Sequence, residues 1–543
     1  MKRLTFLLTL LLLLPTMLLA EGAPRLFLIG DSTCANKRLD KENPERGWGQ
    51  LLPTLLSEEV IVENHAVNGR STKSFRDEGR WQVVYSRLQE GDYLLIEFGH
   101  NDQKINDTTR YSSPSAYAEN LRCYVREARE KGAIPLLLTP IVRRNFVDGV
   151  LTDTHAPYAD TMRMVAQEMG VPLLDMERKT QAWVAALGEE ASKACFMWVE
   201  AGRCPLYPDG RADNTHLNVR GARAVARMVA NALREQVPAL ASYFCDYDWV
   251  VAKDGSGDFF TVGEAVEAIP DFGRDTTRLL ICEGEYREKI AIPATKRLVA
   301  MEGRGKVTIW WDDYADRIGA TGHRLGTSGS STLYFGGEGW RVRNITFENR
   351  AGRVGQAVAV QCLASRLHFV GCRFLGNQDT LYLYASGNQD GQTVRENARM
   401  LFEGCYIEGT TDFIFGAASA LFRNCEIRSK SNSYITAAST CRGQSCGFIF
   451  EGCRLTADEG VERCYLGRPW RDYAQTLFLN CEMGTHILPE GWHDWSKPHA
   501  RKTAYYGEYR STGAGATERG RVKWAHHLSA KEAEKAKKAF GEW

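Results

Sequence analysis

Short apolar runs alternate with amphipathic helical patterns over residues 25 to about 245. The runs are RLFLIG, VIVENHAV, YLLIEFG, AIPLLLTP and VPLLDM, and segments such as SPSAYAENLRCYVREAREKG and GARAVARMVANALREQ separate them. Apolar strands that each precede a helix are typical of a parallel sheet covered by helices on both faces. We therefore expect an α/β domain over residues 24–245, with ligands at the carboxyl ends of its strands.

The pattern changes near residue 246, where short β-rich segments begin to recur. Each carries a cysteine directly after Gly or Asn, and successive cysteines are 33, 20, 28 and 28 residues apart: Cys372, Cys405, Cys425, Cys453 and Cys481. Repeats of about this length, each one coil of short strands, predict a parallel β-solenoid over residues 246–526. Because no CxxC pair accompanies them, we expect the cysteines to stack inside the coils as small apolar side chains.

Both ends of the chain differ from these two patterns. MKR followed by LTFLLTLLLLLPTMLLA predicts a signal peptide over residues 1–20 and hence a secreted or periplasmic protein; an uncleaved membrane anchor is the alternative. The last segment, HHLSAKEAEKAKKAFGEW, predicts a charged helical tail over residues 527–543 that covers the open end of the solenoid. His526 and His527 lack a third spaced ligand, so we expect no metal there.

Composition limits the remaining possibilities. A chain of 543 residues exceeds what one hydrophobic core usually serves, and 44% hydrophobic and 25% charged residues are ordinary for a globular protein. The net charge of +1 gives no basic excess for binding nucleic acid or an anionic membrane. Fifteen cysteines, an odd number, do not resemble a dense disulfide framework. Two local disulfides remain candidates: Cys195–Cys204 and Cys441–Cys446.

Two aspartates follow the ladder cysteines at the same spacing. Asp379 lies seven residues after Cys372, and Asp412 lies seven residues after Cys405. If the cysteines stack, the aspartates occupy equivalent places on neighbouring coils, where strands are ~4.8 Å apart. Two carboxylates that close cannot both ionise readily, so we expect one pKa to be raised and the other held down. Such a pair can supply an acid and a nucleophile; turn aspartates that cap backbone amides are the alternative.

Other motifs offer partners for a carboxylate pair. Arg468 in YLGRPW can hold one aspartate ionised, and Gln356 in GQAVAV and Gln378 in GNQDTLY can donate hydrogen bonds to an oxyanion. Trp470 and Trp495 are candidates for stacking on sugar rings, with core packing as the alternative.

The first domain carries a different set of reactive residues. Ser32 in LIGDSTCANK lies at the tip of the first strand, and DNTHLN supplies Asp213 and His216 three residues apart on one turn or loop. The aspartate can fix the imidazole tautomer while the histidine takes the serine proton. Gly69 in VNGRST and Asn101 in FGHND can donate to an oxyanion through a backbone N–H and a side-chain amide. Each motif alone is weak, and together they predict an acyl-transfer site.

The motifs GEYREK, GQAVAV, GNQDTLY, GTTDFIFG and YLGRPW, in this order, resemble those of the pectin methylesterases, and VVAKDGSGDFFTVGEAVEAIP resembles the opening of that family's domain. The resemblance implies a right-handed parallel β-helix that removes methyl esters from polygalacturonate without a metal or cofactor. It also implies that Asp412 attacks the ester carbonyl, held by Arg468, while Gln356 and Gln378 stabilise the oxyanion. Asp379 then protonates methanol and activates the water that frees the acyl-enzyme.

The blocks GDSTCANK, RGWGQLL, NGRSTKSF and DGRADNTHLN resemble the rhamnogalacturonan acetylesterase branch of the SGNH, or GDSL-like, hydrolases. The resemblance implies a flavodoxin-like three-layer α/β/α domain. Ser32 would be the nucleophile, His216 the base and Asp213 the residue that orients it. The N–H groups of Ser32 and Gly69, with the Asn101 side chain, would form the oxyanion hole.

Taken together, these resemblances predict a secreted pectin esterase with two activities on homogalacturonan and rhamnogalacturonan, no cofactor, no nucleic-acid partner and no membrane span after signal cleavage. One alternative is a polygalacturonase, since close carboxylates also serve glycoside cleavage. Another is a pectin-binding solenoid attached to a single active acetylesterase. Methanol release without new reducing ends would separate the esterase from both, and a chelator should leave both activities unchanged.

Overall fold

The computed structural model describes residues 23–384, 398–517, 519–541 and 543, which divide into two compact units between Phe244 and Cys245. The predicted signal peptide lies outside the described residues. Within these ranges, no helix is both long enough and apolar enough to cross a bilayer.

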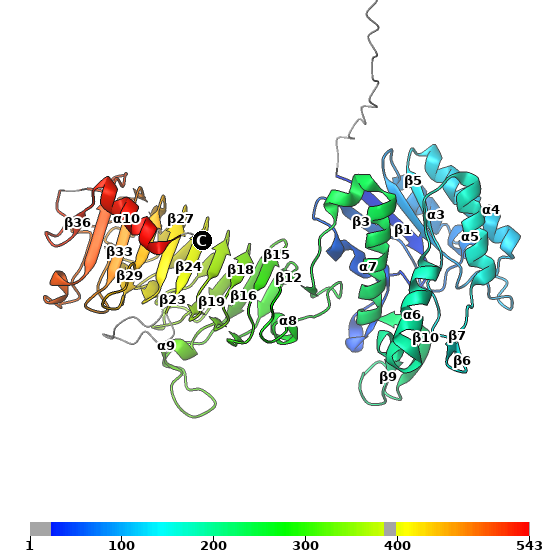
Figure 1. The fold of residues 1–543 in the computed structure, drawn as a ribbon, viewed down its shortest axis with the longest axis horizontal. Coiled ribbons are helices and arrows are strands. Elements are labelled where there is room, and N and C mark those ends of the chain that lie inside the picture. The colour runs from blue at the N-terminus through cyan, green and yellow to red at the C-terminus, as the bar shows by residue number, and fades with distance from the viewer. Residues whose placement is uncertain (1–22, 385–397, 518, 542) are drawn as a thin grey trace, which may run out of the picture. The chain divides into compact units, whose positions relative to one another are not determined.

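The first unit is built around a five-stranded parallel sheet with the strand order β3-β1-β4-β5-β8 (Figure 1). Its strands are β1 (Arg25–Gly30), β3 (Ile61–Asn64), β4 (Tyr93–Glu97), β5 (Ile134–Leu138) and β8 (Leu173–Leu174). Each strand falls within one of the five apolar runs, so the predicted parallel sheet is confirmed.

Successive residues of one strand enter separate cores because a parallel sheet is covered on both faces. In β1, Leu26 and Leu28 join one hydrophobic core, and Phe27 and Ile29 join the other. The first core also receives α1 (Trp48–Leu51), α6 (Met176–Ser192) and α7 (Val219–Gln236). The second receives α2 (Thr72–Asp77), α3 (Arg80–Arg87), α4 (Pro114–Glu130) and α5 (Ala156–Met169). The three-layer α/β/α fold is therefore confirmed.

A small antiparallel sheet, in the order β2-β10-β9, adds to this unit. Its strands are β2 (Glu45–Arg46), β9 (Phe196–Val199) and β10 (Arg211–Asn218). The register shifts in β10, because Asp213 pairs with Met197 whereas Leu217 pairs with the adjacent Phe196. Asp213 and His216 thus lie in an irregular strand, where the sequence predicted a turn or loop. A short hairpin of β6 (Phe146–Val147) and β7 (Val150–Leu151) forms its own two-stranded antiparallel sheet.

The second unit is a parallel β-helix whose coils contribute strands to three sheets (Figure 1). The first sheet contains β11 (Trp249–Val251), β12 (Thr277–Ile281), β15 (Val299–Gly303), β18 (Trp340–Arg343), β21 (Leu367–Val370), β24 (Arg399–Glu403), β27 (Ser419–Arg423), β30 (Phe448–Glu451), β33 (Gln475–Leu479), β35 (Tyr505–Tyr509) and β36 (His526–His527). The second contains β13 (Gly284–Arg287), β16 (Val307–Trp311), β19 (Thr346–Asn349), β22 (Arg373–Leu375), β25 (Tyr406–Gly409), β28 (Glu426–Ser429), β31 (Arg454–Ala457) and β34 (Glu482–Met483). The third contains β14 (Ile290–Ile292), β17 (Leu333–Phe335), β20 (Val360–Cys362), β23 (Leu381–Leu383), β26 (Ile414–Gly416), β29 (Tyr434–Ala438) and β32 (Tyr465–Gly467). The predicted β-solenoid is confirmed.

The five ladder cysteines occupy one position on successive coils, directly before the strands of the second sheet. All are buried in the β-helix core: Cys372, Cys405, Cys425, Cys453 and Cys481. The preceding residue has a positive φ each time, between 52° and 63°, and is glycine or asparagine: Gly371, Gly404, Asn424, Gly452 and Asn480. The recurring GC and NC pairs therefore mark a left-handed turn, which glycine and asparagine tolerate best, followed by an inward side chain.

Phenylalanines form a second ladder three residues before these cysteines. The rings of Phe369, Phe402, Phe422, Phe450 and Phe478 stack in sequence, with centroids 4.5–4.9 Å apart. This spacing matches the distance between neighbouring strands, so the stack and the strand pairing support the same register.

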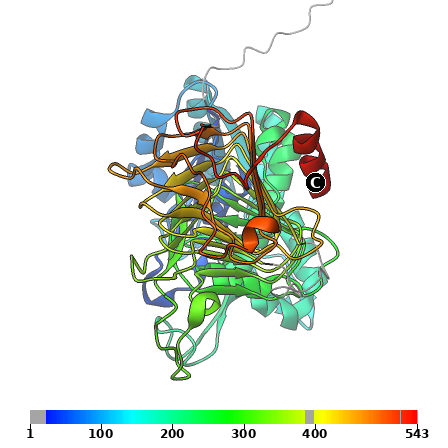
Figure 2. The same cartoon turned by 90° about the vertical axis from the view of Figure 1, so that its left-hand side faces the viewer.

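Helices cover two different parts of the β-helix. The helix α8 (Val262–Ala268) packs on the first coils through Val262, Ala265 and Val266. The C-terminal helix α10 (Ala530–Phe540) instead lies along the outer face of the eleven-stranded sheet (Figure 2). The prediction that the tail covers the open end of the solenoid is therefore wrong. That outer face carries apolar side chains, among them Leu421, Ile449 and Leu477, and α10 buries them.

The prediction of two local disulfides is also wrong. Cys195, Cys204 and Cys446 are free thiols, so neither predicted pair forms. The Cys204 thiol faces backbone carbonyls of residues 41 and 42, whereas Cys195 belongs to the core on one face of the parallel sheet. Cys446 packs in the apolar layer beneath α10.

Candidate functional sites

Asp379 and Asp412 lie on neighbouring coils of the β-helix, at the start of the third sheet. The flanking strands pair with a constant offset of 33 residues, as in Arg373 with Tyr406 and Leu381 with Ile414. The same offset relates the two aspartates. Both line one cavity of about 470 Å³ and are only 4% and 5% exposed. Both also have positive φ angles, 66° and 48°, a strained backbone state for residues other than glycine.

The surroundings of the two carboxyl groups differ. Burial raises the pKa of Asp379 to about 8, and the neighbouring Asp412 charge adds to this rise, while a hydrogen bond from Gln356 opposes it. Burial also raises the pKa of Asp412, and the contact with Arg468 opposes that rise. The expectation that the second pKa would be held down is therefore wrong, because burial outweighs the arginine. Asp379 remains the group that keeps a proton near neutral pH.

Arg468 holds Asp412 through two parallel hydrogen bonds. Its Nε donates to Asp412 Oδ1 at 2.9 Å, and its Nη2 donates to Oδ2 at 2.6 Å. The guanidinium also packs against two aromatic rings, with distances of 3.9 Å to the Tyr434 centroid and 3.6 Å to the Trp495 centroid. A bidentate, stacked arginine fixes both the charge and the orientation of its carboxylate.

The two glutamines line the same cavity beside Asp379. Gln356 and Gln378 pair as neighbouring residues of adjacent coils through a parallel bridge, and the Gln356 side chain hydrogen-bonds to the Asp379 carboxyl group. Neutral amide donors at this point can stabilise an oxyanion without neutralising a nearby nucleophilic carboxylate.

Aromatic side chains form one wall of the cavity. Trp470 and Trp495 both line it, as predicted candidates for sugar stacking, but one face of Trp495 covers Arg468. Tyr382 and Phe415 complete the wall, with ring centroids 4.3 Å apart, and neither was predicted from the sequence. The signal was present, because each follows one of the paired aspartates by three residues and the two pair directly in the third sheet.

The N-terminal domain holds a hydrogen-bonded chain of three residues. His216 Nε2 lies 2.9 Å from Ser32 Oγ, and His216 Nδ1 lies 2.8 Å from Asp213 Oδ2. Asp213 Oδ1 also accepts the backbone N–H of His216 at 3.0 Å, and Arg211 donates to Oδ2. Although burial would raise it, these hydrogen bonds hold the pKa of Asp213 far below its usual range. Asp213 is thus an ionised acceptor that orients the imidazole.

The predicted oxyanion donors lie around Ser32, and all of these residues line one cavity of about 490 Å³. Ser32 follows β1, Gly69 follows β3 and Asn101 follows β4, each at the carboxyl end of its strand. Gly69 has a φ of +77°, a conformation that favours glycine. The Asn101 side-chain amide donates to the carbonyl of residue 70 at 3.0 Å, which orients it.

Three basic residues of this cavity were not predicted: Arg211, which holds Asp213, and two cations in loops, Lys104 and Arg143. Lys104 and Arg143 line it together with Ser32 and His216. Arg143 donates to the His100 carbonyl at 3.1 Å, and its segment follows β5 at the same edge of the sheet. No motif marks them in the sequence, because lone basic residues in loops are common on any surface.

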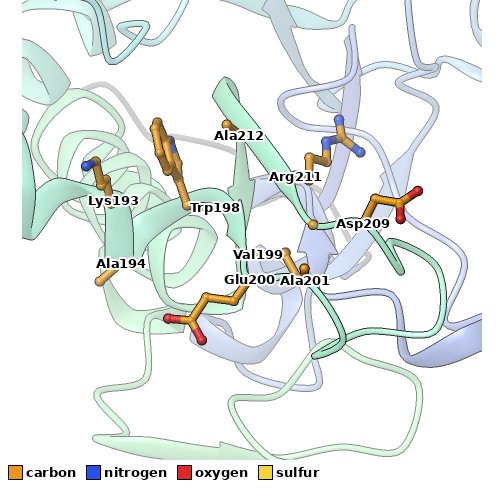
Figure 3. Close-up of a pocket in the computed structure, with 10 residues that line it drawn as sticks. Lys193, Ala194, Trp198, Val199, Glu200, Ala201, Asp209, Arg211 and Ala212 are labelled. Atoms are coloured by element: carbon orange, nitrogen blue, oxygen red, sulfur yellow. The ribbon is translucent and has the colours of Figure 1, made fainter.

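A second cavity of the N-terminal domain, about 590 Å³, lies against the β9–β10 pair (Figure 3). Lys193 and Trp198 stand together on one side of it, with the Lys193 Nζ 4.6 Å from the Trp198 ring centroid, and Arg211 lies on the other side. It contains neither Ser32 nor His216, but Arg211, which donates to Asp213, lines both this cavity and that of the triad.

Within the described ranges, no group of three or more His, Cys, Asp or Glu side chains is arranged to hold a metal ion. The reactive groups of both cavities are carboxylates, a hydroxyl, an imidazole and amides, which suit acyl transfer by general acid–base and nucleophilic chemistry.

Comparisons with known proteins agree with both domains. The pectinesterase family matches residues 248–541, and the GDSL-like lipase/acylhydrolase family matches residues 28–224. Rhamnogalacturonan acetylesterase RhgT of Bacillus subtilis is 43% identical over 212 residues, which cover 39% of this chain and 90% of that protein. Pectinesterase QRT1 of Arabidopsis thaliana is 35% identical over 295 residues, which cover 52% of this chain and 74% of that protein.

Among solved structures, the pectin methylesterase from carrot is similar, with a TM-score of 0.48 and 33% identity over 53% of this chain and 90% of that chain. The folds and the matches define the chain as a carboxylic ester hydrolase with two domains. The chain belongs to the pectinesterase family, and its first domain is of the GDSL type. Both resemblances found in the sequence are confirmed.

Proposed function

We propose that the C-terminal domain hydrolyses methyl esters of galacturonate in pectin and that the N-terminal domain removes O-acetyl esters from pectic polysaccharide such as rhamnogalacturonan. The observation that carries the proposal is the pairing of Asp379 and Asp412 in one cavity, where Arg468 holds Asp412 through two hydrogen bonds. The names of the relatives support the substrate classes of both domains.

In the first methylesterase step, an Asp412 oxygen attacks the ester carbonyl carbon, and the carbonyl oxygen becomes an oxyanion. Gln356 and Gln378 donate hydrogen bonds to this oxygen. The bond between the carbonyl carbon and the methoxy oxygen then breaks, and protonated Asp379 gives its proton to the departing methanol. An anhydride between Asp412 and the galacturonate remains.

In the second step, ionised Asp379 takes a proton from water, and the hydroxide oxygen attacks the galacturonate carbonyl of the anhydride. The bond to Asp412 breaks, which returns its carboxylate to Arg468 and releases the free sugar acid. Asp379 is protonated again, so the site is ready for the next ester. The rise in its pKa to about 8 suits a group that alternates between acid and base near neutral pH.

In the acetylesterase reaction, His216 takes the Ser32 proton as the Ser32 oxygen attacks the acetyl carbonyl. The Gly69 N–H and the Asn101 amide stabilise the oxyanion, and His216 returns the proton to the departing sugar hydroxyl. Water then attacks the acetyl-serine by the reverse proton path, which releases acetate. The 2.9 Å contact between His216 and Ser32 supports these roles.

The substrate is a cell-wall polymer too large to enter a cell, so we also infer that the protein is exported to the periplasm or the medium. The predicted leader at residues 1–20 supports this inference. Aromatic Trp470 and Trp495 in the methylesterase cavity would contact the sugar rings.

The decisive experiment assays methanol, acetate and new reducing ends separately on acetylated, methyl-esterified pectin. Asp412→Ala should lose methanol release but still release acetate from the same acetylated polymer once its methyl esters have been removed, whereas Ser32→Ala should release methanol and no acetate. Methanol release at the wild-type rate in Asp412→Ala would refute the methylesterase site. New reducing ends would instead support the polygalacturonase alternative, and polymer binding without any methanol would support the binding module.

A further inference from the structure

The two catalytic cavities differ in charge. In the methylesterase cavity, Arg468 is the only basic residue of the described lining, and Asp412 neutralises it through two hydrogen bonds. With Asp379 protonated, this lining carries no net charge. A methyl-esterified galacturonate is also uncharged at that group, so the cavity matches it without desolvating an unpaired ion.

The acetylesterase cavity instead has basic residues in excess. Glu45 is its acidic lining residue, and it already pairs with Lys37 at 2.8 Å and with Arg211 at 3.4 Å. Arg211 also pairs with Asp213, so its charge is satisfied within the site.

Lys104 and Arg143 are the two cations of this cavity that form no ion pair with any described residue. Burial, Arg110 and Arg143 lower the Lys104 pKa, and the charges of Asp31 and Asp107 oppose this shift. Burial likewise lowers the pKa of Arg143, against the charges of Asp31 and Asp213. Arg143 is half-buried and Lys104 is exposed, and a bound anion would stabilise these two like charges, which line one cavity without an ion-pair partner.

The arginine is held in place on the wall of the cavity. Its Nη2 donates to the His100 carbonyl, and its segment follows β5, at the edge of the sheet where Ser32, Gly69 and Asn101 also lie. In the Gln103 amide orientation that satisfies its neighbours, the Gln103 side-chain oxygen also accepts from this guanidinium, and the N–H groups that remain can donate to a carboxylate.

We propose that Lys104 and Arg143 bind a free carboxylate of the acetylated polymer, so that the N-terminal domain acts on galacturonate units after their methyl esters have been removed. This inference rests on the proposed function, and it assigns an order to the two reactions. Methyl ester hydrolysis creates the carboxylate that the acetylesterase cavity binds, so the first reaction supplies the substrate of the second. The two residues are specificity determinants and take no part in breaking the ester bond.

The test compares two forms of one acetylated polygalacturonate in acetate release by the wild-type chain: the free acid, and the carboxamide, which is neutral and carries no methyl ester. We expect a KM about tenfold lower for the acid with a similar kcat, and a difference that shrinks with added salt. On methyl-esterified, acetylated pectin, acetate release should show a lag that prior removal of the methyl esters abolishes. Equal KM values for acid and amide would overturn the proposal.

Arg143→Gln and Lys104→Gln should each raise the KM for the acid polymer several-fold and leave the KM for the amide unchanged. Hydrolysis of p-nitrophenyl acetate, which has no carboxylate, reports whether each variant still folds and reacts. Arg143→Lys keeps the positive charge and should retain part of the preference for the acid polymer over the amide polymer. This variant tests the proposal even if Arg143→Gln does not fold. Lys179→Gln removes an equal charge on α6, outside the cavity, and should change nothing. An equal effect in Lys179→Gln would overturn the assignment, since the general field of the protein would then explain it.

The outcomes separate this proposal from the proposed function. If the wild-type chain cleaves p-nitrophenyl acetate but releases no acetate from either polymer, the proposed acetylesterase function fails. If it releases acetate from both polymers equally well, the function stands and the carboxylate site fails. Oligomers with one acid unit, placed either on the acetylated sugar or on its neighbour, identify which sugar supplies the carboxylate.

Discussion

Asp379 must hold a proton to act as an acid, and its surroundings decide the pH range in which it does so. With a pKa raised to about 8, the resting enzyme loses this proton above that pH. We therefore predict that kcat/KM for methanol release falls about tenfold per pH unit above pH 8, as measured with a soluble methyl-esterified oligogalacturonate. The acidic limb should lie above pH 3.8, because the pKa of Asp412 is raised as well. A flat profile to pH 9.5 would contradict the assignment.

The same raised pKa predicts a cost in stability. The unfolded chain releases the Asp379 proton near pH 3.8, whereas the folded chain keeps it up to about pH 8, so folded-state stability falls as pH rises between these values. Asp379→Asn removes this penalty and should raise the stability of the β-helix by about 2–4 kcal/mol at pH 8, with little gain at pH 4. Calorimetry of the full chain measures it, and the N-terminal transition serves as the internal control. A gain of equal size at both pH values would point to packing as its cause.

Replacement of Arg468 by lysine tests the geometry of the carboxylate clamp. Lysine keeps the charge but cannot form two parallel hydrogen bonds or stack between Tyr434 and Trp495. Arg468→Lys should lower kcat for methanol release by about 10²-fold with a small change in KM. Arg454→Lys, at an exposed ion pair with Glu426, is the matched control and should have no effect. A KM effect alone would assign Arg468 to substrate binding.

Motif residues could be predicted because their chemistry and their spacing point in the same direction. Asp379 and Asp412 share one distance from a ladder cysteine, and Asp213 and His216 lie three residues apart. Lys104 could not be predicted in the same way, because its significance is the lack of an ion-pair partner in a cavity lined by six separate segments of the chain. The pKa of Asp412 was missed for a similar reason, since burial has no sequence signal of its own.

At the scale of one coil, a left-handed turn precedes each cysteine of the ladder and recurs from coil to coil. Gly404 and Gly452 have φ angles of 58° and 63°, but a Cβ on Gly452 would lie 2.6 Å from Asn424 Oδ1, whereas nothing lies within 4 Å at Gly404. Gly404→Ala should cost about 1 kcal/mol from the backbone alone. Gly452→Ala should cost about 0.5–1 kcal/mol more, because the Asn424 amide must move.

A double-mutant cycle checks the origin of the extra cost. Asn424→Gly should recover it in the Gly452→Ala background and should be neutral toward Gly404→Ala, as measured by chemical denaturation of the β-helix. Equal costs at the two glycines would show that the neighbouring coil accommodates the methyl group freely.

The repeated coils of the β-helix were predicted correctly, whereas the position of the single C-terminal helix was not. The coils recur in the sequence, so strand after strand supports the same assignment. Ala533 and Phe540 lie on one side of α10, so the sequence predicts an amphipathic helix there. It does not predict which surface of the β-helix this helix covers. That surface is formed by Leu401, Leu421 and Ile449, whose outward direction becomes clear only once the register of the eleven-stranded sheet is known.

At the scale of the whole chain, two ester hydrolases with differently charged cavities are joined covalently. One cavity matches a neutral ester and the other matches the acid that its hydrolysis leaves behind. Methyl ester hydrolysis therefore creates the carboxylate that the acetylesterase cavity binds. Covalent linkage is useful in this situation because a chain bound through one domain keeps the other domain near the same polymer.

Linkage can be tested with full-length chains alone. The wild-type protein is compared with an equimolar mixture of the Ser32→Ala and Asp412→Ala chains, with the concentrations of intact methylesterase and intact acetylesterase sites made equal in the two samples. We predict that the wild-type protein releases acetate from methyl-esterified, acetylated pectin faster than the mixture does. The advantage should be several-fold at low polymer concentration and should vanish when polymer is abundant, because the active domains are then saturated without help from a linked domain. On polymer whose methyl esters have been removed beforehand, both samples should release acetate equally. An advantage that persists on this polymer would mean that the second domain contributes binding alone, and no advantage on either would mean that the two sites work independently.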